Sequence, residues 1–202
     1  MSVKITYFVH GTTTDNENHR STGQLHGELS SRGIQQSKEL KNQISLDDFD
    51  GVFCSDLQRA VDSAKYTFGG VKPIIQDKRL RECDYGDLNG ADETLVVYEQ
   101  HIYKSFPNGE SMQEVEKRMR AFCAFLLKNY NGKHIAIVAH KAPQFAFQVI
   151  TEKKSWEQVI DEDWRKRKAW QPGWEYVIEP FYNEPSPPKG NYAFIDGQNL
   201  HL

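Results

Sequence analysis

Hydrophobic and polar residues alternate over residues 3–9, with valine, isoleucine and tyrosine on one face and Lys4 and Thr6 on the other. This period of two predicts a short β-strand. His10 and Gly11 follow directly, so the histidine stands where the strand ends. Ligands of open α/β sheets bind beyond the carboxyl ends of the strands, which makes His10 a candidate site residue.

A second apolar run, residues 133–139, also ends in a histidine, His140. Its small and apolar residues are nearly continuous, as is typical of a strand buried on both faces. If the two strands are parallel neighbours, both imidazoles project from one edge of the sheet into a single crevice.

The remaining pattern alternates between helices and strands. Apolar residues at helical spacing and the capping box of Ser111 with Glu114 predict a helix over 111–128. Further helices are expected at 30–43, 56–64 and 142–150, and further strands at 50–54, 73–76 and 173–178. This rhythm predicts an α/β fold, a three-layer α/β/α sandwich around a mostly parallel sheet.

Two polar stretches interrupt this pattern. Residues 12–27 predict a long loop over the sheet edge, and residues 80–90 form a second, glycine-punctuated and acidic loop. Arg59 falls in the first turn of the 56–64 helix. Helix N-termini favour anions, so an arginine at this position suits the binding of an anion together with free backbone N–H groups.

Composition excludes several classes of protein. The 202 residues carry a net charge of −3, which argues against a dedicated nucleic-acid binder. No apolar run approaches a membrane span or a signal peptide, so we expect a cytoplasmic protein without a membrane partner. The three cysteines lack metal or redox spacing; Cys54 and Cys123 are expected to be buried, and Cys83 partly exposed.

A basic run at residues 164–168 lies among tryptophans. Such a run either grips phosphates or a nucleic acid, or forms a solvated helix end.

Six short motifs between residues 3 and 178 resemble those of the histidine phosphatase superfamily, the clan of phosphoglycerate mutases and acid phosphatases. They are residues 9–11, 29–33, 54–60, 80–90, 109–111 and 138–140. Each motif alone is weak, whereas six in the expected order are specific. The resemblance implies a phosphomonoesterase that acts on a small phosphorylated metabolite without a metal or other cofactor.

The resemblance also implies roles for four residues. His10 would attack phosphorus and become a phosphohistidine, while Arg59 and His140 would bind the phosphoryl oxygens. Glu82 would protonate the leaving alkoxide and then take a proton from water. Without the other motifs, Glu82 would be interpreted as a surface carboxylate in a salt bridge.

Two positions depart from the family pattern. Val9 stands where the family has an arginine, and losing one donor to the transferring group costs about 3 kcal/mol, or about a hundredfold in rate. Lys141 stands where glycine is usual after the second histidine. Lys141 either restores the missing charge or points to solvent, and Arg20 and Asn16 in the 12–27 loop are further phosphate-binding candidates.

A competing function is a catalytically weakened module that binds a phospholigand or serves as a scaffold, attached to a nuclease domain. Val9 favours it, and the four catalytic and phosphate-binding residues together argue against it. A mutase of the phosphoglycerate type is disfavoured, because residues 90–110 contain no added arginines for a substrate carboxylate. The sequence determines neither the natural substrate nor the oligomeric state.

The end of the chain has a different composition. Residues 180–190 contain four prolines and predict a stiff linker. Residues 191–202 resemble the opening strand of NYN nuclease domains, whose first acidic metal ligand would correspond to Asp196. We therefore divide the chain into a histidine phosphatase-like domain (1–179), the linker and an NYN-like stub; the alternative is a terminal strand on the main sheet.

Overall fold

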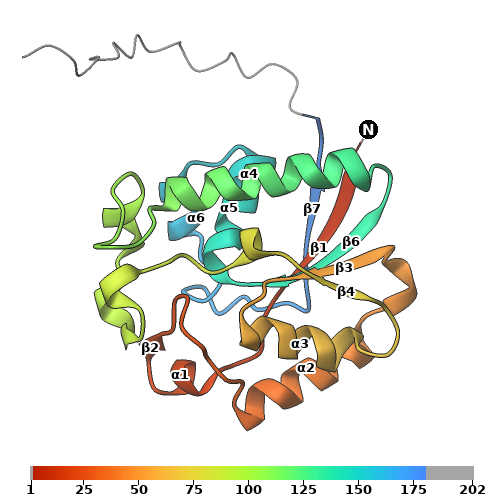
Figure 1. Ribbon diagram of the computed structural model, residues 1–202, viewed down its shortest axis with the longest axis horizontal. Helices are drawn as coiled ribbons and strands as arrows, with labels where there is room; N and C mark the ends of the chain where they lie inside the picture. The colour runs from red at the N-terminus through yellow and green to blue at the C-terminus, as the bar shows by residue number, and fades with distance from the viewer. Residues whose placement is uncertain (1, 181–202) are drawn as a thin grey trace, which may run out of the picture.

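A five-stranded sheet forms the centre of the computed structural model, which describes residues 2–180 (Figure 1). Its strands are β1 (Val3–Val9), β3 (Gly51–Cys54), β4 (Ile74–Gln76), β6 (His134–Ala139) and β7 (Trp174–Ile178). They lie in the order β4-β3-β6-β1-β7. All neighbouring pairs are parallel except β1 and β7, so the expectation of a mostly parallel sheet is confirmed.

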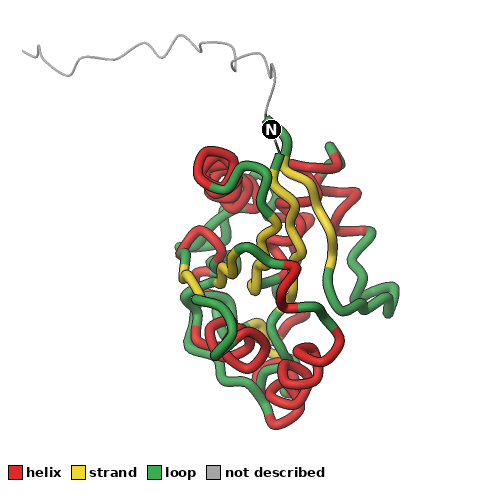
Figure 2. The backbone as a smooth tube through the Cα atoms, turned by 90° about the vertical axis from the view of Figure 1, so that its right-hand side faces the viewer, coloured by secondary structure: helices red, strands yellow, loops and turns green. Residues whose placement is uncertain are grey.

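Helices cover both faces of this sheet (Figures 1 and 2). One face carries α2 (Ser31–Gln43) and α3 (Gln58–Phe68), and the other carries α4 (Met112–Asn129), α5 (Lys141–Glu152) and α6 (Trp156–Asp161). Short 3-10 helices are η1 (Leu46–Asp48), η2 (Lys78–Leu80), η3 (Gly86–Leu88), η4 (Glu93–Leu95) and η5 (Tyr98–His101). The predicted three-layer α/β/α sandwich is confirmed.

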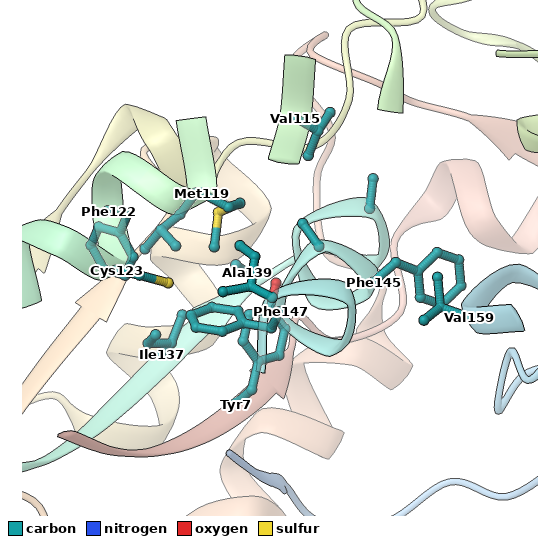
Figure 3. Close-up of a cluster of buried hydrophobic side chains, with 14 of the residues drawn as sticks. Tyr7, Val115, Met119, Phe122, Cys123, Ile137, Ala139, Phe145, Phe147 and Val159 are labelled. Carbon is teal, nitrogen blue, oxygen red and sulfur yellow. The ribbon is translucent and has the colours of Figure 1, made fainter. Parts of the chain in front are cut away.

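The core is divided by the sheet into two hydrophobic clusters. The larger packs the inward side chains of β1 and β6 against α4, α5 and α6, and Figure 3 shows Tyr7, Ile137 and Phe147 within it. The smaller packs Phe8 against Phe68 of α3. Both faces of β1 are therefore buried, as is typical of a strand in the middle of a sheet that helices cover on both sides.

The structure corrects three details of the predictions. Residues 12–27 are not a plain loop, because a capping box between Thr13 and Asn16 starts the short helix α1 (Thr14–Glu17). Strand β2 (Arg20–Ser21) follows α1 and pairs with β5 (Ala91–Asp92). Helix α3 begins at Gln58, two residues later than predicted, and residues 164–168 form turns, not a helix end.

The predicted NYN-like stub, and the predicted linker apart from Pro180, lie outside the described residues. Within residues 2–180, none of the helices is both long and apolar enough to cross a membrane.

Candidate active site

The two histidines predicted to lie together follow neighbouring parallel strands. Val9 at the end of β1 is in register with Ala139 at the end of β6, and the His10 N–H donates to the Ala139 carbonyl over 3.0 Å. The imidazole rings of His10 and His140 consequently lie face to edge, with their centroids 5.0 Å apart. The sheet thus brings the two rings together at one of its edges, as the sequence predicted.

The hydrogen bonds of His10 define the tautomer of its imidazole ring. Its Nδ1 lies 2.7 Å from the Gly11 carbonyl oxygen, which can only accept, so Nδ1 carries the proton. Its Nε2 accepts a long hydrogen bond of 3.4 Å from Arg59 Nε. Burial, and then the charge of Arg59, lower the pKa of His10 to about 3. The imidazole is therefore neutral at physiological pH, with Nε2 free to act as a nucleophile.

His140 is completely buried, and neither of its ring nitrogens has a hydrogen-bond partner among residues 2–180. Its pKa also lies well below the usual value, because burial and the neighbouring Arg59 disfavour the charged form. Buried polar atoms are normally satisfied, so a ring of this kind at a sheet edge is suited to hydrogen bonding with a ligand.

Arg59 is the second residue of α3 and is almost fully buried. Its guanidinium donates to the carbonyls of Gly23 (2.7 Å) and Leu25 (3.2 Å), in addition to His10. These contacts fix the guanidinium beside Nε2 of His10. Among residues 2–180, three of its five N–H groups have these partners and the other two have none.

Glu82 lies against the start of α5, the helix that follows His140 in the chain. Its Oε1 accepts from the backbone N–H of Ala142 (3.0 Å) and of Cys83 (2.8 Å), and its Oε2 accepts from that of Lys141 (3.2 Å). These donors orient a carboxyl group that is nearly buried. The side chain is thus not a surface carboxylate in a salt bridge.

The other predicted phosphate-binding residues are engaged elsewhere. The Lys141 ammonium lies 3.3 Å from the buried carboxylate of Asp163. The Arg20 guanidinium donates to the Gly90 carbonyl over 3.0 Å. Asn16 lines the pocket beside His10, but its side-chain oxygen accepts the N–H of Thr13 in the capping box.

A pocket of about 770 Å³ opens over His10. Besides Val9 and residues of α2, its walls include three residues that sequence reasoning did not assign to the site: Trp164, Arg165 and Trp170. Their signal in the sequence was the basic run at 164–168 and the tryptophan that follows it at 170. The sequence left open whether that run binds phosphate or is a solvated helix end. Because the run lies far from His10 along the chain, its proximity to His10 in space could not be predicted.

The cysteines take no part in this site. All three are buried, and Cys83, expected to be partly exposed, is fully covered. Burial raises the pKa of the Cys54 and Cys123 thiols to about 12, and it also raises that of Cys83. Within the described part of the chain, no group of three or more His, Cys, Asp or Glu residues is arranged to hold a metal ion.

The sequence is similar to those of known enzymes. Over 142 residues, 65% of this chain and 66% of the relative, the sequence is 30% identical to a probable phosphoglycerate mutase of Enterobacter sp. strain 638. It is 26% identical over 155 residues to phosphoserine phosphatase 1 of Hydrogenobacter thermophilus, covering 71% of this chain and 74% of that one. The aligned part therefore spans about two thirds to three quarters of these relatives.

The same fold occurs in a solved structure of phosphoserine phosphatase from Entamoeba histolytica in complex with 3-phosphoglyceric acid. That chain superposes with a TM-score of 0.69 at 24% identity, over 79% of this chain and 84% of that one. The family model for the histidine phosphatase superfamily (branch 1) matches residues 7–161, which contain His10, Arg59, Glu82 and His140. This chain belongs to the histidine phosphatase superfamily.

Proposed function

We propose that this protein is a phosphomonoesterase that hydrolyses a small phosphorylated metabolite through a phosphohistidine formed on His10. The observation that carries the proposal is the state of this imidazole. It is neutral, its proton is held on Nδ1 by the Gly11 carbonyl, and its free Nε2 lies 3.4 Å from Arg59 Nε. Several relatives are named phosphatases, which supports the same reaction class.

In the first step, His10 Nε2 attacks phosphorus in line with the leaving oxygen. The N–P bond forms as the P–O bond to the leaving group breaks, and charge spreads over three equatorial oxygens. Arg59 then donates to these oxygens in place of its long contact with Nε2, and the ring of His140 supplies a further hydrogen bond. Both groups are already fixed by the protein, so little reorganisation is needed.

Glu82 is the general acid of the first step and the general base of the second. Its carboxyl group protonates the leaving alkoxide in the first step and accepts a proton from the attacking water in the second, when the N–P bond breaks and inorganic phosphate is released. The three backbone N–H donors hold this carboxyl group in one position through both steps.

A second function, a weakened module that only binds a phospholigand, is favoured by one observation, the valine at position 9. Hydrolysis of p-nitrophenyl phosphate in the presence of a chelator separates the two. We expect the wild type to exceed His10→Ala by at least about a hundredfold, since removing a nucleophile abolishes the covalent route. Equal rates would leave only the binding module.

Three further predictions of the sequence belong to this proposal. They are a cytoplasmic location, the absence of a cofactor, and the lack of a nucleic-acid partner for residues 1–179.

A further inference from the structure

The site described so far offers a transferring phosphoryl group little positive charge. His10 and His140 are neutral, and three of the five N–H groups of Arg59 already bind the protein. The ammonium of Lys141 is neutralised by Asp163. Because charge develops on three equatorial oxygens, one more cation on the open side of the pocket would stabilise the transition state.

Arg165 is the cation with the matching position. It lines the same pocket as His10 and Val9, and no carboxylate within residues 2–180 forms an ion pair with it. The next two basic residues of the run, by contrast, pair with Glu99 and Asp161. Its guanidinium carbon lies 4.9 Å from the ring of Trp164.

The segment that carries Arg165 is held from several directions. The Trp164 indole N–H donates to the buried side-chain oxygen of Gln144 over 3.2 Å, and the Trp164 ring lies 5.1 Å from that of Trp174. The Arg165 backbone N–H donates to one carboxylate oxygen of Asp163 over 2.9 Å. The other oxygen of this carboxylate binds Lys141, at the start of α5. An arginine on such a support is preorganised, and less side-chain entropy is lost when it binds an anion.

The charge of Arg165 already reaches both histidines. Burial and Arg59 are the main causes of the low pKa of His10 and of His140, and Arg165 adds to the lowering at each ring. An exposed cation that acts on both imidazoles also acts on a phosphoryl group bound beside them.

We propose that Arg165, contributed by the turn that follows α6, binds the phosphoryl group at His10 and supplies the charge that Val9 does not. This role rests on the proposed function, and it assigns the substrate phosphate to the Arg165 side of the pocket. Arg165 reaches the site from the last part of the domain, far from position 9 in sequence. Its planar guanidinium offers two parallel N–H donors to a pair of phosphoryl oxygens.

The test compares Arg165→Ala with Arg167→Ala, a control from the same turn whose side chain pairs with Asp161 outside the pocket lining. Two readouts are needed: kcat/KM for p-nitrophenyl phosphate, and the inhibition constant of orthovanadate or the titration of inorganic phosphate. We expect Arg165→Ala to lower kcat/KM by about tenfold to a hundredfold and to weaken oxyanion binding. Arg167→Ala should change neither, and Arg165→Lys should retain part of both.

A fourth variant, Val9→Arg, tests whether positions 9 and 165 supply the same charge. Val9→Arg should raise kcat/KM of the Arg165→Ala variant by a larger factor than it raises kcat/KM of the wild type. Because Val9 packs partly against the core, each variant is first checked by thermal unfolding. If Val9→Arg does not fold, the comparison of Arg165 with Arg167 still decides the question.

The measurements distinguish a wrong assignment of Arg165 from a wrong proposed function. If the wild type is more active than His10→Ala, but Arg165→Ala equals the wild type in rate and in oxyanion binding, then the assignment of Arg165 is wrong. The proposed phosphatase function is not affected by that result. The same holds if Arg32→Ala, at the other cation in the pocket lining, causes the loss instead. If the wild type is no more active than His10→Ala, the proposed function itself fails, whatever Arg165 binds.

Discussion

The hydroxyl of Tyr7 holds the backbone of His140 at two points. It donates to the His140 carbonyl over 2.6 Å and accepts from the His140 N–H over 3.0 Å. Tyr7 is fully buried on β1, three residues before His10, and its ring packs against Phe147 of α5. One side chain thus ties the turn that presents the second histidine to the strand that presents the first.

Replacing this tyrosine should therefore loosen the site. In Tyr7→Phe the buried N–H of His140 loses its acceptor, and the His140 C=O keeps only the 3.3 Å contact with the Gln144 N–H, which we expect to cost about 1–3 kcal/mol of unfolding free energy. The rate should fall as well, because His140 is no longer held against His10. Urea unfolding and kcat/KM measure the two effects. A variant with wild-type stability and rate would show that the hydroxyl does not position His140.

The leaving group reveals whether Glu82 is the acid. In Glu82→Gln, kcat/KM should fall by about a hundredfold or more for an alkyl phosphate such as glycerol phosphate, whose alkoxide needs a proton. The loss should be several-fold smaller for p-nitrophenyl phosphate, because nitrophenolate leaves without one. Equal losses on both substrates would assign Glu82 a structural role at the start of α5.

Stability should depend on pH through the two buried histidines. The pKa of His10 is about 3 in the folded chain and near 6.5 when unfolded, so only the unfolded chain takes up the proton between these values. The free energy of unfolding is then highest above pH 6.5 and falls as the pH drops toward 3. Each such histidine contributes up to about 1.4 kcal/mol per pH unit.

Urea unfolding at pH 7, 6 and 5 measures this slope. His10→Gln should make the slope shallower, and the same change at the exposed His26 is the matched control for the substitution. A wild-type slope in His10→Gln would contradict the low pKa assigned to this imidazole.

Much of this molecule could be predicted from its sequence. The alternation in β1 and the apolar run of β6 predicted that His10 and His140 would meet, because parallel neighbouring strands end at one edge. The capping box at Ser111 predicted the start of α4. Local signals of this kind determine elements, and the order of the elements limits the topology.

The directions of long side chains could not be predicted from the sequence. No local pattern shows that the Lys141 ammonium pairs with Asp163, or that Trp164 and Arg165 line the pocket with His10. These contacts join residues far apart in the chain, and their geometry follows from packing of the whole domain. The short elements α1 and β2 were hidden for a similar reason, since β2 exists only through its pairing with β5.

The ion pair of Lys141 with Asp163 should act on catalysis through Arg165. Lys141→Met removes one anchor of the turn, so kcat/KM should fall by several-fold in the wild type and hardly at all once Arg165 is alanine. If Lys141 instead touched the phosphate itself, the full loss would persist in the Arg165→Ala background. Kinetics of the two single variants and the double variant distinguish these roles.

The most direct measurement is to trap the covalent intermediate. The protein is mixed with a rapidly hydrolysed phosphate monoester, quenched in alkali, in which phosphohistidine survives, and digested for mass spectrometry. We predict one added phosphoryl group on His10 in the wild type, and none in His10→Ala. A wild-type enzyme that hydrolyses the substrate while the phosphoryl group is found on another residue, or on none under single-turnover conditions, would contradict the central claim.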